Sequence, residues 1–369
     1  MLRLRFRHVQ RFPERLRVFA GCAVLLLVGV FAGACGGDRA APERLLYAFD
    51  GPIMGTGYTV QIVRPGEAPL DEARQQELRA LLLERMDEVN RLMSTYLDES
   101  ELSRFNRTGV DEEMVLSPPT VEVLRAAFDI AEKTGGALDV TIGPLVNAWG
   151  FGPAAIDSAP AAEELERLAQ NVGHETLRFE SVPGTLAKTH PEVYVDLSSV
   201  AKGYAVDRVY EALRAEGLDD VFVEIGGETR VHGSNPDGMP WRLGIERPQA
   251  LRAVQRIIAL DNAALATSGD YRNYREENGR RLSHLIDPRT ARPIDHRLAS
   301  VSVVRPTCLE ADGLSTALMI LGPDEGYAYA EREGIAALFL VREGDDFVER
   351  ASPTFTATYM PGASTAVTP

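Results

Sequence analysis

The chain has 369 residues, 45% of them hydrophobic and 25% charged, a composition that excludes a disordered chain, a collagen and a disulfide scaffold. It carries 54 acidic and 39 basic residues, a formal net charge of −15. This charge argues against nucleic acid as a partner, because nucleic-acid-binding proteins neutralise phosphates with Lys and Arg.

The N-terminus has the pattern of an export signal. Residues 1–34 hold six arginines and one glutamate, a net +5, so the remainder of the chain carries −20. An apolar run over 18–34 follows the arginines and ends in small residues before Cys35. Ala32-Gly33-Ala34-Cys35 is similar to a bacterial lipobox, with Ala32 where Leu is commonest. We therefore expect an exported protein, lipid-anchored through Cys35 and facing the periplasm or the cell exterior.

The alternative for the apolar run is a transmembrane anchor, for which its length is at the short limit. With the lipoprotein interpretation, the chain divides into a signal peptide (1–34), a lipid-anchored tether (35–45) and one large domain (46–360). Cys308 is then the only cysteine of the folded part, so no internal disulfide is expected.

The first half of the domain begins with two strands, over 47–49 and 58–63, which are rich in aromatic and β-branched residues. Apolar residues at helical spacing predict a helix over 71–93. Ser117 as N-cap and Pro118 as first residue predict a second helix, which Gly135-Gly136 ends. The stretch 150–190 is the least regular and holds a short helix near 161–170.

The second half opens with a strand over 193–197 and a helix that Ser198 or Ser199 caps and that runs to about residue 216. Further strands are expected near 221–225, 229–232, 241–246, 255–260, 282–286, 299–304, 336–341 and 346–350, with helices near 311–321 and 323–333. Because strands and helices do not alternate strictly, the pattern predicts an α+β fold in one large mixed domain.

Lys202 stands in the first turn of the helix after Ser198-Ser199. Free N–H groups make a helix N-terminus an anion site, where a lysine is explained if it meets a phosphate. The alternative is an ordinary surface lysine.

Asp312 and Thr316 are four residues apart and share one helix face. A carboxylate and a hydroxyl suit a hard cation such as Mg²⁺, although Asp312 would equally serve as a helix-start acid. His284 lies near the end of an expected strand, before the Asp287-Pro288 turn, and a lone His is more often structural. Dinucleotide-binding, Walker A, zinc-protease and nucleophile-elbow motifs are absent from the sequence.

The chain resembles the ApbE-type flavin transferases, the FAD:protein FMN transferases, in nine segments between about 50 and 325. These segments include Met54-Gly55-Thr56, Met93-Ser94-Thr95-Tyr96, Thr134-Gly135-Gly136-Ala137-Leu138-Asp139, Asp196-Leu197-Ser198-Ser199-Val200-Ala201-Lys202-Gly203-Tyr204, Gly226-Gly227-Glu228, Thr267-Ser268-Gly269-Asp270, Ser283-His284-Leu285-Ile286-Asp287-Pro288 and Ala311-Asp312-Gly313-Leu314-Ser315-Thr316.

The resemblance implies binding of FAD and, with Mg²⁺, transfer of FMN onto a Ser or Thr hydroxyl of a target flavoprotein, releasing AMP. The implied targets are subunits of membrane electron-transfer complexes, which a lipid-anchored enzyme is suitably placed to meet.

The resemblance also implies roles for individual residues. Met54, Tyr96, Ala137, Leu138 and Asp139 would line the FAD site, and Lys202 would approach the pyrophosphate. Asp312 and Thr316 would hold Mg²⁺ with the backbone near Ser199 and with Ser315. His284 would orient the ligand or Asp312, and Asp312 would also take the proton of the acceptor hydroxyl.

Two positions depart from the family pattern: Ser198-Ser199, where Gly is common, and Gly313, where Ala is common. Two other activities remain open: a Mg²⁺-dependent FAD pyrophosphatase that makes FMN and AMP, and a flavin-binding lipoprotein without turnover.

Overall fold

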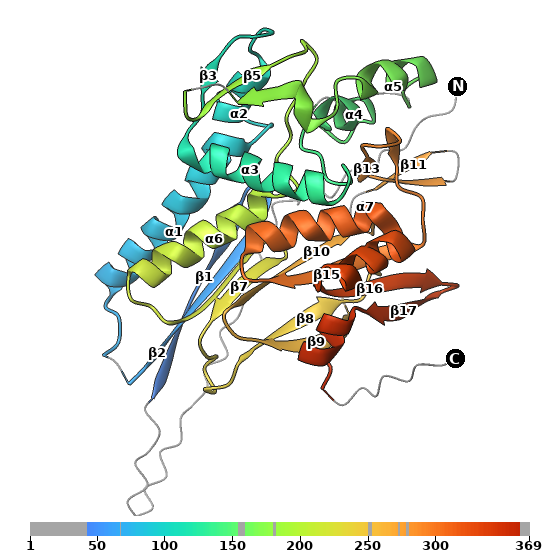
Figure 1. Ribbon diagram of the computed structural model, residues 1–369. Helices are drawn as coiled ribbons and strands as arrows, with labels where there is room; N and C mark the ends of the chain where they lie inside the picture. The colour runs from blue at the N-terminus through green and yellow to red at the C-terminus, as the bar shows by residue number, and fades with distance from the viewer. Residues whose placement is uncertain are drawn as a thin grey trace, which may run out of the picture.

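The central feature of the fold is an antiparallel sheet of eight strands (Figure 1). The computed structural model describes residues 43–361, apart from residue 67 and the segments 154–158, 180–181, 250–252, 272–273 and 278–279. The expected signal peptide, Cys35 and most of the tether lie outside these residues. Among the helices described, none has the length and apolarity needed to cross a membrane.

The strands of this sheet follow the order β1, β2, β6, β7, β10, β15, β16, β17. Their bounds are β1 (Arg44–Ile53), β2 (Thr56–Pro65), β6 (Asp220–Ile225), β7 (Glu228–His232), β10 (Ala263–Gly269), β15 (Leu298–Arg305), β16 (Ala336–Glu343) and β17 (Asp346–Ala351). In β6, buried Val221, Val223 and Ile225 alternate with half-buried residues, as expected for a strand with unequal faces. β15 and β16 are buried along almost their whole length, because the sheet is covered on both sides there.

Helices cover one face of the sheet (Figure 1). They are α1 (Glu72–Met93), α6 (Ala201–Ala215) and α7 (Cys308–Arg332), whereas α3 (Pro118–Lys133) packs on α7 and α1. The other face carries the ribbon of β8 (Trp241–Glu246) and β9 (Val254–Leu260), with α8 (Pro353–Tyr359). A large apolar core lies under the helices and a smaller one under the ribbon.

The remaining elements gather at one end of the helical layer (Figure 1). They are α2 (Glu101–Asn106), β3 (Met114–Val115), α4 (Gly143–Ala148), α5 (Ala162–Ala169), a 3₁₀ turn (His174–Thr176), β4 (Leu177–Phe179), β5 (Thr185–Lys188), β11 (Tyr274–Glu277), β12 (Arg280–Ser283), β13 (Ile286–Asp287) and β14 (Arg292–Pro293). The fold is thus the expected mixed α+β arrangement.

Two expected strands were wrong. Residues 193–197 form no strand, since only Tyr194 makes an isolated bridge, to Ile142. The Asn106 side chain takes over the pairing there, because it donates to the Val195 carbonyl and accepts from the Val195 N–H, both at 2.8 Å. The strand expected over 282–286 is broken at His284, which lies in a bend between β12 and β13.

α3 begins at Pro118 after Ser117, as expected, but the hydrogen bonds at its start involve another helix. Ser117 occupies the N-cap position, but its hydroxyl caps no N–H of its own helix. Instead, the buried Glu101 carboxylate of α2 accepts from the Ser117 N–H at 2.9 Å, from the Ser117 hydroxyl at 2.8 Å and from the Thr120 hydroxyl. A carboxylate from another helix thus caps α3.

α7 bends at Gly322, which is the residue between the two helices expected over 311–321 and 323–333. Gly322 has a φ of 83° and Pro323 follows it. Pro323 has no N–H, so the Met319 carbonyl loses its helical partner. The His296 Nε2 lies 2.9 Å from that carbonyl and donates to it, since a carbonyl only accepts.

Candidate functional site

The first turns of α6 and α7 lie against each other and bring Lys202 and Asp312 together. Gly203 allows this approach: a Cβ there would lie 2.4 Å from the Cys308 carbonyl oxygen and 2.7 Å from Asp312 Cβ. Only a residue without a side chain fits between the two helices.

The start of α6 differs from the expectation that Ser198 or Ser199 caps it. The helix begins at Ala201, and Val200 is its N-cap residue, without a side-chain cap bond. Ser198 lies one turn earlier, where its N–H donates to Asp196 Oδ1 at 2.9 Å. Ser199 lies in the same turn, close to the N-terminus of α6.

Asp312 provides the cap that α6 lacks. Its side chain is buried, and Oδ2 accepts from the Gly203 N–H at 2.9 Å. This N–H is one of those that the first turn of a helix leaves without an internal partner. Asp312 is therefore not a helix-start acid of its own helix, α7.

Lys202 is shared between two carboxylates. Its Nζ lies 2.9 Å from Glu228 Oε1 and 3.7 Å from Asp312 Oδ2. These contacts offset the unfavourable position of a lysine at a helix N-terminus. The Lys202 side chain is 31% exposed and its two partners are buried, so this side chain is the part of the cluster that reaches solvent.

The pKa values in the cluster reflect burial and mutual charge. Burial raises the pKa of Asp312 well above its usual range, and the Glu228 charge adds to this against the opposing effects of Lys202 and the Gly203 N–H. Burial alone would lower the pKa of Lys202, but the charges of Asp312 and Glu228 outweigh it and raise that pKa. The lysine therefore stays protonated beside the two carboxyl groups.

A chain of hydroxyls adjoins Asp312. The Ser315 hydroxyl donates to the Asp312 carbonyl at 2.9 Å, and Ser268 Oγ lies 2.8 Å from Ser315 Oγ and 3.0 Å from Thr316 Oγ1. Each hydroxyl has one proton, so Ser268 must donate to Ser315, and Thr316 to Ser268. The Thr316 oxygen keeps lone pairs for a cation, whereas fully buried Ser315 is used within the chain.

The turn between β1 and β2 lies beside this cluster. Met54 and Gly55 form a two-residue hairpin turn with φ values of 47° and 73°, and such a φ is uncommon for Met. The next residue, Thr56, and the Lys202 side chain both lie within 3.4 Å of where a Gly226 Cβ would be. The structure therefore places Thr56, two residues after Met54, near the Lys202 side chain.

The other residues expected to line the FAD site differ in accessibility. Tyr96 is 68% exposed and offers an open ring face. Ala137 and Leu138 are buried as whole residues, so neither presents surface to a ligand in this structure. Asp139 Oδ1 accepts from the Thr141 N–H and hydroxyl at 2.8 and 2.6 Å, and burial raises the pKa of this carboxyl despite these bonds.

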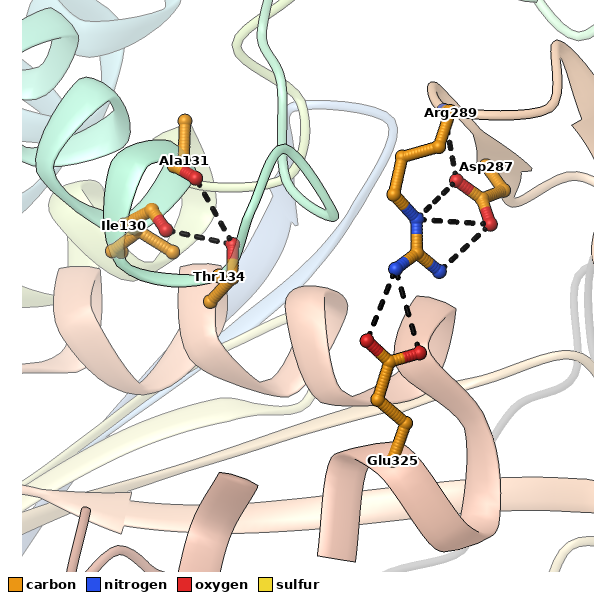
Figure 2. A network of polar contacts seen from close by, with 6 residues as sticks. All are labelled: Ile130, Ala131, Thr134, Asp287, Arg289 and Glu325. Carbon is orange, nitrogen blue, oxygen red and sulfur yellow. Dashed lines mark hydrogen bonds and ion pairs between the residues drawn. The ribbon is translucent and has the colours of Figure 1, made fainter. Parts of the chain in front are cut away.

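His284 contacts Phe151 edge to face, with ring centroids 6.4 Å apart. The turn that follows it is tied to α7, as Figure 2 shows: Arg289 bridges Asp287, at 2.9 Å, and Glu325, at 3.2 Å. Asp287 thus has a structural role in holding this loop against the second half of α7.

Figure 2 also shows the C-terminal end of α3, where the Thr134 hydroxyl donates a hydrogen bond to the Ile130 carbonyl.

The donor set suits a hard cation. Within the described residues, no three His, Cys, Asp or Glu side chains are grouped as metal ligands. A site here would therefore combine Asp312 with the Thr316 hydroxyl and backbone carbonyls, all oxygen donors of the type that Mg²⁺ prefers.

Two residues of the cluster, Glu228 and Ser268, received no role from sequence reasoning. Both stand in segments that resemble the family, Gly226-Gly227-Glu228 and Thr267-Ser268-Gly269, so their position in those segments was the available signal. At Gly313, which departs from the family pattern, a Cβ would lie 2.6 Å from Ile130 Cδ1, so the end of that side chain would have to shift to admit alanine.

Comparisons with known proteins agree on one family. Residues 54–339 match the model of the ApbE family. The FAD:protein FMN transferase of Vibrio cholerae is 48% identical over 83% of this chain and 90% of its own length. That of Haemophilus influenzae is 42% identical over 89% of this chain and 97% of its own length.

Solved structures extend the similarity to the fold. The flavin transferase ApbE from Vibrio cholerae superposes with a TM-score of 0.77 at 42% identity, covering 85% of this chain and 99% of that one. The apo form of the Pseudomonas stutzeri flavinyl transferase ApbE gives a TM-score of 0.78 at 39% identity, covering 86% and 98%.

Proposed function

Because the chain belongs to the ApbE family and is an FAD:protein FMN transferase, we propose that its reaction needs Mg²⁺ and releases AMP. The observation that carries this proposal is the cluster of Lys202, buried Asp312 and the Thr316 hydroxyl where α6 and α7 meet. It combines a cation for a pyrophosphate with oxygen donors for a metal ion.

In this proposal, Asp312, Thr316 and a carbonyl near Ser199 hold Mg²⁺, which when bound neutralises the charge of the pyrophosphate. Lys202 contacts the pyrophosphate from the exposed side of the cluster. Met54, Tyr96 and the segment of Ala137, Leu138 and Asp139 contact the rest of FAD. His284 orients the ligand from the loop before β13.

The reaction is a displacement at phosphorus. The acceptor hydroxyl oxygen forms a bond to the phosphorus of the FMN half, and the bond from that phosphorus to the bridging oxygen breaks. AMP leaves with the bridging oxygen, whose charge Lys202 stabilises. The hydroxyl proton passes to the Asp312 carboxylate, which acts as the base.

The acceptor is a Ser or Thr hydroxyl of a target flavoprotein, and we propose a subunit of a membrane electron-transfer complex. The signal-like segment 1–34 and Cys35 support an exported enzyme, lipid-anchored and facing the periplasm or the cell exterior. Replacing Cys35→Ser should release the protein from the membrane fraction and abolish labelling by a radioactive fatty acid.

Incubation with FAD, Mg²⁺ and an acceptor domain tests the activity. Transfer predicts acceptor mass increased by FMN on a Ser or Thr, with an equal amount of AMP. Free FMN and AMP in the presence of acceptor, without labelled acceptor, would instead identify a pyrophosphatase. FAD binding with no AMP would identify a flavin-binding protein.

A further inference from the structure

Glu228 has a position that the transfer reaction does not yet explain. It is the first residue of β7, directly after the two-residue turn Gly226-Gly227, whose φ values are 64° and 110°. This turn directs the start of β7 toward the N-terminus of α6, where Glu228 meets Lys202. Glu228 is only 5% exposed, so it is a carboxylate removed from water.

The two oxygens of Glu228 differ in their contacts. Oε1 accepts from Lys202 Nζ at 2.9 Å. Oε2 is buried and has no hydrogen-bond partner among the described residues. A buried carboxylate with one unsatisfied oxygen lowers the stability of the folded protein, so we looked for a role of Glu228 that its contact with Lys202 would serve.

The two distances from Lys202 Nζ to the carboxylates indicate such a role. The ammonium lies closer to Glu228 than to Asp312, by 2.9 against 3.7 Å. Only the 2.9 Å separation from Glu228 is short enough for a hydrogen bond, because 3.7 Å is beyond the hydrogen-bonding range. Without Glu228, Asp312 would be the one nearby counter-charge for the ammonium among the described residues, and a tight pair would form there.

We propose that Glu228 is a positioning residue that holds Lys202 away from Asp312 and so leaves the Asp312 carboxylate open to a cation. This inference rests on the proposed function, in which Asp312 binds Mg²⁺. Glu228 itself contacts neither the cation nor the pyrophosphate. Its effect on the cation passes through Lys202.

The experiment is calorimetric titration of the FAD-free protein with Mg²⁺ alone, which measures binding rather than turnover. Glu228→Gln keeps the shape of the side chain and removes its charge. The affinity for Mg²⁺ should fall about tenfold, because Lys202 then competes with the cation for Asp312.

If Lys202 is the competitor for Asp312, removing its ammonium should abolish the effect of Glu228→Gln on the Mg²⁺ affinity. In a Lys202→Met background, Glu228→Gln should change the Mg²⁺ affinity less than about twofold, because the effects of substitutions at contacting residues do not add. An equal loss in both backgrounds would show that Glu228 acts on the cation directly and would overturn the proposal. Unchanged affinity on Glu228→Gln alone would also overturn it.

Glu224→Gln is the matched control. Glu224 belongs to the same hairpin and its Oε1 accepts from the Gly227 N–H at 2.6 Å, so the substitution removes one charge without touching Lys202. Its Mg²⁺ affinity should stay within about twofold of wild type. A tenfold loss there would assign the effect to net charge and contradict the positioning role.

Two further variants keep the outcome interpretable. If Glu228→Gln does not fold, Glu228→Asp keeps the charge on a shorter side chain and should weaken Mg²⁺ binding less than Glu228→Ala does; equal losses would contradict the proposal. Asp312→Asn tests the premise separately. If it leaves Mg²⁺ binding intact, the proposed metal site is wrong, whatever Glu228 does.

Discussion

Asp207 and Asp312 each cap the N-terminus of the other's helix. Asp312 of α7 accepts from the Gly203 N–H of α6, at 2.9 Å. Asp207 of α6 accepts from the Cys308 and Leu309 N–H groups of α7, both at 2.8 Å. The two antiparallel helices are therefore joined by reciprocal hydrogen bonds at the point where the site is formed, and the position of Asp312 depends on both.

Asp312→Asn should abolish most of the transfer activity. The amide cannot take a proton from the acceptor and is a weaker ligand for a hard cation, so we expect a loss of at least about 100-fold in kcat. FMN-labelled acceptor measured by mass spectrometry gives the rate, and excess chelator should have a similar effect on the wild type. Full activity of the variant with Mg²⁺ present would rule out the dual role of Asp312.

Gly203→Ala should push α6 and α7 apart. The new Cβ would overlap the Cys308 carbonyl and Asp312, which is overpacking of the kind that costs about 1–3 kcal/mol. Urea unfolding should show this loss, and transfer should fall by more than the fraction unfolded explains, because Asp312 is displaced. Gly109→Ala, on an exposed loop with only ordinary contacts, is the control and should change neither quantity.

Asp207→Asn should destabilise the domain by about 2–3 kcal/mol, because it leaves the poorly exposed Arg230 without the carboxylate that lies 2.7 Å from it. The lost charge also weakens the cap of α7. Urea unfolding measures the effect. Asp219→Asn removes an exposed partner of Arg214 and should have almost no effect, so equal losses in the two variants would contradict the capping role.

Glu101→Ala should destabilise the domain more than Ser117→Ala does. Glu101 satisfies the Ser117 N–H and two hydroxyls at the start of α3, and its removal should cost about 2–3 kcal/mol. Ser117→Ala keeps the backbone bond and should cost about 1 kcal/mol or less. The reverse order in urea unfolding would restore Ser117 as the principal cap.

His296 should make part of the stability depend on pH. Burial lowers the pKa of His296, and the bond to Met319 and the charge of Asp270 offset this only partly. Between that lowered pKa and the ordinary value near 6.5, the unfolded chain binds more protons, so stability rises with pH and is lost on acidification.

His296→Gln removes this dependence while its amide N–H still reaches the Met319 carbonyl. The difference in unfolding free energy between wild type and variant should therefore shrink from pH 7 to pH 5. A pH-independent difference for His296→Gln would contradict the prediction.

Most elements could be predicted from the sequence because their signals are local. The apolar spacing of 71–93 and the alternation of 220–225 each describe one side chain after another along the chain, and both elements formed as expected. The alternation of Val193, Val195 and Leu197 correctly indicated that these residues are buried. They form no strand because the Asn106 side chain, rather than a neighbouring strand, pairs with the Val195 backbone.

By itself, the sequence determined the α+β class, the resemblance to the ApbE family and the residue types at the site, because these lie in contiguous segments with local patterns. Only the tertiary structure decided that Lys202 is shared by Glu228 and Asp312, and that Asp312 caps α6. These contacts join residues 26 to 110 positions apart, and they depend on the close approach of two helices that Gly203 permits. The motifs along the chain show which side chains the site contains, whereas the distances between these side chains are set by the packing of the helices and strands.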